Sequence, residues 1–213
     1  MVQTLPIAKT ITSIAEFEER FNLTATDNNQ FFPEWYQNLP ELSDEEKESL
    51  DKIYHRFLRH RRRGKLAEGT VNLLLISPLL ELAGFYDEPF FIGTEAQVEI
   101  TLEDRDELLR GRIDTLVIQE ELWVLVVESK QSISMAAAIP QALTYMMGNP
   151  HPEKPVYGMV TDGDLFMFIK LLKEEPPQYD FSDTFSLFLL RQNKLYDILR
   201  VLKRIGELIR HLA

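Results

Sequence analysis

The sequence predicts an α/β fold in which helices flank a central mixed β-sheet. Two apolar, β-branched runs, residues 113–118 and 122–127, are separated by the polar residues 119–121, which is typical of an antiparallel strand pair. Apolar residues at helical spacing precede and follow these runs. The expected order of elements is helices, three strands, a helix, a strand pair, and then a strand and a helix. That order is typical of a sheet sandwiched by helices.

Length and composition are those of an ordinary globular chain. The 213 residues, 45% hydrophobic and 27% charged, contain no internal repeat, low-complexity tract or clear linker, so we expect one domain over residues 1–213. The chain has no cysteine, which excludes disulfides and cysteine-based zinc sites. It has no run of eighteen apolar residues and no signal-peptide pattern. We therefore expect a cytoplasmic protein with no membrane partner.

Residues 1–65 are expected to form an N-terminal helical extension. Residues 12–21 carry a cap and apolar residues at helical spacing, and Ser43 with Glu46 forms a capping box. The helix that this box opens should run toward Arg63 and end at Gly64. The aromatic cluster at residues 31–36 could stack on nucleic-acid bases or form a satellite core, and the latter is the more usual role of such a cluster.

A basic cluster ends this extension. Arg61, Arg62, Arg63 and Lys65 could complement the negative end of the helix dipole. They could equally contact phosphate, because this is the only basic cluster in a chain whose net charge is −11. The acidic balance argues against a surface that coats nucleic acid broadly.

The middle of the chain reads as helix and then strands. Residues 66–85 are nearly all apolar, which predicts a buried helix broken or kinked at Pro78. Strands are expected at 95–102 and 108–118, joined by the charged residues 103–107. Arg112 should share a strand face with Asp114, where it would pair with a carboxylate or contact phosphate.

The last third predicts a helix, a hairpin, a strand and a helix. The helix after residue 134 contains Pro140, either as a kink or in its first turn. Residues 156–170 read as a hairpin with an Asp162-Gly163 turn, in which the aspartate serves backbone geometry. A C-terminal strand and helix are expected at 185–213. The helical part, residues 195–212, is amphipathic, so it either closes the core or lies in the seam of a homodimer.

Charged side chains gather around the two central strands. Asp114 lies in the first strand, and Glu128 and Lys130 end the second, on one face because strand side chains alternate. Charges at the rim of an apolar layer are costly unless they are paired or bind a cation. Two carboxylates and a lysine suit metal-assisted hydrolysis of a phosphodiester, because Mg²⁺ takes hard oxygen ligands and lysine can act on the attacking water. A simple salt bridge between Glu128 and Lys130 is the alternative.

These residues resemble the core motif of the PD-(D/E)xK nucleases. Asp114 followed by Glu128-x-Lys130 matches it, with Ile113 in place of the usual proline. Gln141-x-x-x-Tyr145 resembles the additional motif of the RecB-type and type I restriction branches. The resemblance covers residues 66–172 and implies a restriction-endonuclease-like core. It also implies that Gln141 and Tyr145 face the metal and the bound strand, although a buried tyrosine bonded to a glutamine is the alternative.

The segment before the strands resembles the nuclease domain of type I restriction motor subunits. Ile76, Pro78-Leu79-Leu80 and Gly84-Phe85 match the pattern of that domain. By this resemblance Glu68 joins Asp114 and Glu128 as a metal ligand. The alternative is a glutamate that merely favours the first turn of its helix.

The resemblance implies a Mg²⁺-dependent nuclease, with Mn²⁺ as a substitute metal, that cleaves DNA in restriction or repair. In this interpretation Lys130 positions or activates water, and a protein partner supplies targeting. The alternative is a non-catalytic nucleic-acid-binding or assembly module that keeps the fold. The sequence leaves open DNA against RNA, and single against double strands.

Overall fold

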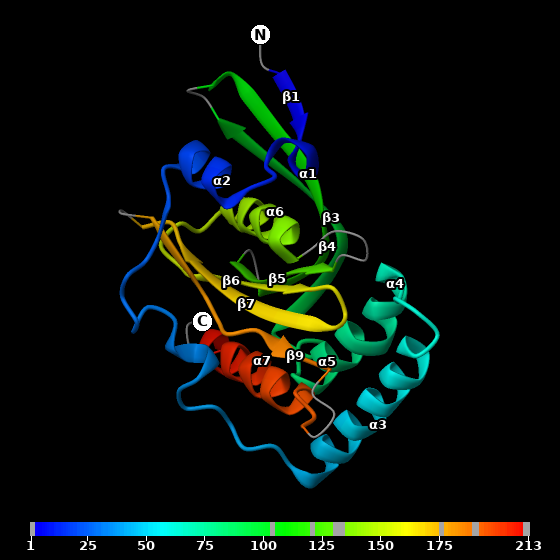
Figure 1. Cartoon of the computed structure of the whole chain (residues 1–213). Coiled ribbons are helices and arrows are strands. Elements are labelled where there is room, and N and C mark those ends of the chain that lie inside the picture. Colours follow the sequence, from blue (N-terminus) through cyan, green and yellow to red (C-terminus); the bar gives the residue numbers. More distant parts are fainter. Residues whose placement is uncertain are drawn as a thin grey trace.

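The computed structural model describes residues 3–102, 105–119, 122–129, 135–174, 177–188 and 192–210, with the backbone alone at residues 122, 124–129 and 136. Within this part of the chain, nine strands form one mixed sheet that is flanked by helices (Figure 1). The α/β fold expected from the sequence is therefore confirmed.

The centre of the sheet is an antiparallel trio extended by a parallel strand. β3 (Phe90–Leu102), β4 (Glu107–Gln119) and β5 (Leu122–Ser129) pair antiparallel, and β5 pairs parallel with β6 (Val156–Thr161). A helix, α6 (Met135–Met147), makes the crossover between β5 and β6. The remaining strands are β1 (Gln3–Pro6), β2 (Thr24–Ala25), β7 (Leu165–Leu172), β8 (Gln178–Phe181) and β9 (Phe185–Ser186).

Helices cover the sheet on opposite faces (Figure 1). One face carries α1 (Ile7–Thr10), α2 (Ile14–Phe21) and α6. The other face carries α3 (Asp44–Arg61), the segment α4 (Glu68–Val71), η2 (Asn72–Ile76) and α5 (Ser77–Leu82), and α7 (Leu195–Arg210). A short 3₁₀ turn, η1 (Pro33–Trp35), lies in the chain between α2 and α3.

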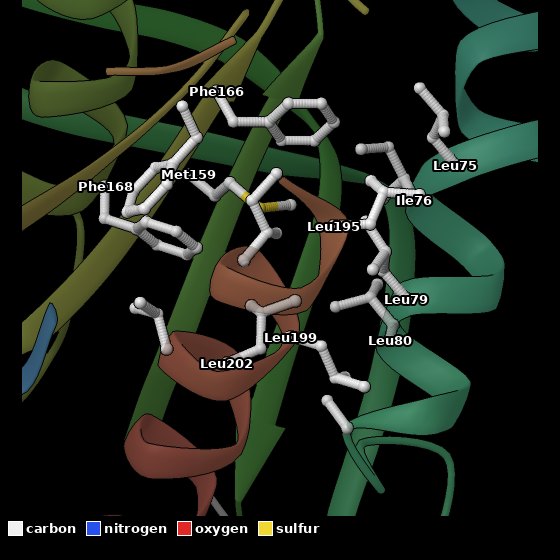
Figure 2. Close-up of a cluster of buried hydrophobic side chains, with 14 of the residues drawn as sticks. Leu75, Ile76, Leu79, Leu80, Met159, Phe166, Phe168, Leu195, Leu199 and Leu202 are labelled. Carbon is white, nitrogen blue, oxygen red and sulfur yellow. The ribbon is translucent and has the colours of Figure 1, made fainter. Parts of the chain in front are cut away.

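The core between the sheet and α7 is here called the α7 core. In Figure 2, Ile76, Leu79 and Leu80 of η2–α5 point toward α7, and Phe166 and Phe168 of β7 close the cluster. Leu199, Leu202 and Ile205 of α7 are fully buried within this single chain. α7 therefore closes the core, and its apolar face is not left uncovered for a dimer seam.

The core under α6 is here called the α6 core. It contains the α1 and α2 residues Ile7 and Phe17, the strand residues Leu109 and Ile113, and Tyr145 of α6. Gly111 of β4 allows the close approach of α6, because an added Cβ would lie 2.5 Å from Tyr145 Cε1. Replacing Gly111 would force the tyrosine ring out of its position.

The predicted helix signals formed as expected. The side chains of Ser13 and Ser43 each accept a hydrogen bond from the backbone N–H three residues later. The carboxylates of Glu16 and Glu46 in turn accept a hydrogen bond from the backbone N–H of these serines, so both capping boxes are complete. Gly64, with φ +132°, follows the end of α3. The Asp162 carboxylate accepts the backbone N–H groups of Asp164 and Leu165, which confirms its role in the turn.

Three expectations about the elements need correction. Residues 1–65 are not purely helical, because β1 pairs parallel with β4 and β2 pairs parallel with β8. The first central strand begins at Phe90 and not at residue 95, and in the described part of 185–190 only Phe185–Ser186 is strand. At Pro78 the helix continues, because a π-helical stretch precedes it and places the proline in the first turn of α5.

The aromatic cluster at residues 31–36 belongs mostly to the core. Phe32 is fully buried, and Phe31 and Trp35 pack against the α7 core. Lys170 of β7 ties this segment to the sheet, since its Nζ lies 2.6 Å from Glu34 Oε1 and 2.7 Å from the Phe31 carbonyl oxygen. The satellite-core interpretation is the one that fits.

Candidate metal and nucleic-acid site

In β3 and β4, the regular alternation of side chains between the two faces of the sheet is interrupted at the same point along their pairing. On β4, Ile113 belongs to the α6 core, whereas Thr115 lies on the opposite side, against η2–α5. On β3, Ala96 packs against the α6 core, whereas Thr94 lies on the η2–α5 side. Residues two apart on a strand normally share a face. Glu95, with φ +55°, interrupts this alternation.

Asp114 lies at this point, opposite Glu95 and between two regular residue pairs of the ladder. Because the alternation is interrupted, the consecutive residues Asp114 and Thr115 line one pocket, and so do Thr94 and Glu95. The pocket has a volume of about 360 Å³. Its other wall comes from the helical segment and includes Gly69, Asn72, Leu73, Ile76, Ser77 and Leu80.

Glu68 is the first residue of α4, directly before this wall. Its side chain is partly buried, and the next residue, Gly69, lines the pocket with Asp114. The chain therefore brings the helical segment to the strand that carries Asp114, although more than forty residues separate them in the sequence.

Glu128 lies on β5, the strand next to β4, just beyond the last paired residues of the two strands. The pairing of β4 with β5 ends at Thr115 opposite Val127, so Asp114 and Glu128 are the next residues along the two strands. The side chain of Glu128 and the whole of Lys130 lie outside the described residues. The expected convergence of Asp114, Glu128 and Lys130 therefore stays a prediction.

Gln141 and Tyr145 bond to each other in the α6 core. Gln141 Nε2 donates to Tyr145 Oη at 2.6 Å, and the two residues are 5% and 2% exposed. They share a helix face, as expected. Neither lines the pocket that contains Asp114, whose other wall is formed by η2–α5. The expectation that Gln141 and Tyr145 face the metal and the bound strand stays a prediction, because the Glu128 side chain and Lys130 lie outside the described residues. Their mutual hydrogen bond and burial match the other interpretation of this motif, a buried tyrosine bonded to a glutamine.

Arg61 is engaged in a structural ion pair. Its Nε and Nη2 donate to the two carboxylate oxygens of Asp164 at 2.7 and 2.8 Å, and its guanidinium lies over the ring of Phe188. The Asp164 side chain is 9% exposed. This pair fastens the end of α3 to the turn between β6 and β7, so Arg61 is not available for phosphate in this arrangement.

The other predicted cations are on the surface. Arg62, Arg63 and Lys65 are exposed and lie between α3 and the start of α4. Arg112 Nη1 lies 2.8 Å from Glu95 Oε2, and both side chains are about two-thirds exposed. Arg112 therefore pairs with a carboxylate beside Asp114, which is one of the two roles expected for it.

Two features of the pocket could not be found by sequence reasoning. Glu95 was expected to be an ordinary strand residue, and alternation gives no signal of its positive φ. Tyr86 and Leu73 line the pocket while remaining 48% and 71% exposed. An exposed apolar side chain in an apolar run carries no sequence signal of its own.

No protein-family model matches the chain, and no curated protein matches it. Across the described residues, no group of three or more histidines, aspartates or glutamates gathers in a manner that could hold a metal ion, and the Glu128 side chain is not among them. The helices of the described part include none that is both long and apolar enough to cross a membrane.

Proposed function

We propose that this chain is a Mg²⁺-dependent nuclease that hydrolyses phosphodiester bonds, with DNA as its substrate in restriction or repair. One observation carries the proposal. Asp114 lies at a change of face shared by two strands and lines a pocket whose opposite wall begins at Gly69, directly after Glu68.

The arrangement of elements supports the proposal. The segment from α4 to α5 is followed by three antiparallel strands, a crossover helix and a parallel strand, an order consistent with a restriction-endonuclease-like core. Asp114 and Glu128 are the residues directly beyond the last pair, Thr115 and Val127, of β4 and β5. The register therefore brings the backbones of Asp114 and Glu128 close together on adjacent strands.

The donor types fit magnesium. Carboxylate oxygens are hard ligands of the kind that Mg²⁺ takes from proteins, and Glu68, Asp114 and Glu128 would supply them. When bound, the ion would lower the pKa of a coordinated water and offset charge on the phosphoryl oxygens. Lys130 would orient that water or accept its proton.

Gln141 and Tyr145 would support the site from behind the sheet. Tyr145 packs beside Gly111, three residues before Asp114 on β4. Since Tyr145 is almost fully buried, its contribution would be to fix β4 and not to contact the strand that is cut.

The test is cleavage of labelled single- and double-stranded DNA and RNA with Mg²⁺ or Mn²⁺, combined with calorimetry of metal binding. The wild type should cut at least one substrate, and Asp114→Asn should lose both cleavage and metal binding. Asp27→Asn, at an exposed loop position, is the matched control and should retain both. Wild-type protein that neither binds Mg²⁺ nor cuts any substrate would refute the proposal.

The second candidate is a non-catalytic module that binds nucleic acid or another protein. The mutual hydrogen bond of Gln141 and Tyr145 within the α6 core favours it, because these two residues are not at the pocket. Nucleic-acid binding that is independent of metal and unchanged in Asp114→Asn would support this candidate.

A further inference from the structure

The pocket of Asp114 has an exposed apolar wall. Tyr86 and Leu73, 48% and 71% exposed, line it together with the buried or partly buried Ile76, Leu80 and Ile92. Leu73 and Tyr86 are two of the five large hydrophobic residues that are exposed among those described. Exposed apolar side chains that line a pocket are typical of a ligand-binding groove.

This wall is fixed in place. The Tyr86 hydroxyl lies 2.6 Å from the hydroxyl oxygen of Ser77, which holds the ring against the start of α5. Ile76 and Leu80, which line the pocket, also belong to the α7 core, where Figure 2 shows them against α7. The pocket is therefore formed before any ligand binds, and binding pays little to order it.

We propose that Tyr86 and Leu73 hold an unpaired nucleobase next to the phosphodiester at Asp114, so that the substrate is a single strand or a frayed end. This inference rests on the proposed function. A nucleotide joins a charged phosphate to a flat, largely apolar base, and the pocket offers a carboxylate on one side and an aromatic and aliphatic wall on the other. Aromatic rings stack on any base, so the pocket selects an unpaired base and not a sequence.

The size of the pocket favours one nucleotide over a duplex. About 360 Å³ lies at the low end of the range for small-molecule sites. In a duplex each base is stacked and paired inside the helix and cannot reach such a wall without being flipped out, which costs unstacking. Thr94 and Thr115 also line the pocket, and a threonine hydroxyl can form a hydrogen bond with the polar edge of a base.

The experiment measures binding of labelled single-stranded DNA with phosphorothioate linkages, and of the matching duplex, in Mg²⁺. The variants are Tyr86→Ala, Tyr86→Phe and Leu73→Ala. Phe91→Ala is the matched control, because Phe91 is 65% exposed on β3 but does not line the pocket. Circular dichroism verifies that each variant is folded.

Tyr86→Ala should weaken single-strand binding by about 5- to 150-fold, the loss of one stacked base. Leu73→Ala should weaken it less, and Tyr86→Phe and Phe91→Ala should bind as the wild type does. Equal wild-type affinity for duplex and single strand would overturn the inference. So would wild-type binding by Tyr86→Ala, or a Tyr86→Phe variant as weak as Tyr86→Ala.

The outcomes also separate this inference from the proposed function. A wild type that cuts nothing but shows this pattern of binding would refute the nuclease and support the base pocket. Cleavage of duplex DNA that is unchanged in Tyr86→Ala would support the nuclease and refute the base pocket.

Discussion

Asp114 owes its surroundings to the backbone of a residue on the adjacent strand. Glu95 has a left-handed φ of +55° in the middle of β3, a conformation that costs a non-glycine residue roughly 1–3 kcal/mol. The exposed ion pair with Arg112 offsets little of this cost, because such pairs contribute less than about 1 kcal/mol. The packing of both strands on two different cores must therefore hold the change of face in place.

At the residue scale, the first prediction separates two roles within the proposed site. Lys130→Met keeps the aliphatic stem and removes the charge, so folding and Mg²⁺ binding should survive. Cleavage should fall by roughly two to four orders of magnitude if the lysine takes part in proton transfer. Calorimetry and initial cleavage rates measure the two effects. Unchanged cleavage by Lys130→Met would remove the lysine from the mechanism.

The second prediction separates Arg61 from its basic neighbours. Arg61→Ala leaves the carboxylate of Asp164 nearly buried without its bidentate partner, which should lower the free energy of unfolding by about 1–3 kcal/mol. Arg62→Ala, at an exposed position, should change it by less than about 0.5 kcal/mol. Denaturant unfolding measures both, and equal stability of the two variants would show that the Arg61 pair has no structural role.

Single residues also show where sequence reasoning ends. Asp114 and the basic run were proposed from residue type and motif, because clustered charge is visible in the sequence, and Glu68 was proposed from the resemblance alone. The partners of these residues were not. That Arg61 is bound by Asp164, about a hundred positions away, follows only from how the β6–β7 turn meets α3.

At the scale of elements, the sequence predicted helices whose signals are local, but it did not predict strands that form only by pairing with a distant part of the chain. The caps at Ser13 and Ser43 act within one helical turn, so the sequence reveals them. β1 contains Pro6 and forms only by pairing with β4, and β2 has two residues that pair with β8. Such short strands have no periodicity of their own and exist because a distant strand edge satisfies their backbone groups.

The third prediction concerns the contact between α3 and α7. Burial opposes ionisation of Glu46, but a hydrogen bond from Lys203, with support from the Ser43 backbone N–H, outweighs it and lowers the pKa of Glu46 below its ordinary value of 4.5. The ionised form therefore stabilises the folded chain, fully above about pH 4.5 and progressively less as the pH falls through the lowered pKa.

Glu46→Gln should consequently be less stable than the wild type at pH 7, and the difference should shrink as the pH is lowered from about 5 to 3. Thermal unfolding across this range measures it. Glu48→Gln is the control, because Glu48 is 75% exposed and its contact with Lys52 is long, at 3.7 Å. A difference between Glu46→Gln and the wild type that does not vary with pH would contradict the assignment.

At the scale of the whole molecule, an acidic chain must approach an acidic polymer. With a net charge of −11, most of the surface repels phosphate. Arg62, Arg63 and Lys65 lie in the connection that leads from α3 directly into α4, and Gly69 of α4 lines the pocket of Asp114. The exposed cations are therefore only a few residues along the chain from the helical wall of the proposed site, and they are few.

The last prediction follows from that number. Binding of single-stranded nucleic acid should weaken with salt at a logarithmic slope of about −0.7 for each phosphate neutralised, hence about −2 for three cations. Replacing Arg62, Arg63 and Lys65 together by alanine should weaken binding and bring the slope toward zero. Lys9→Ala, exposed on α1 at the other face of the sheet, should leave the slope unchanged. A steep slope that survives the triple replacement would mean that the nucleic acid follows another surface of the molecule.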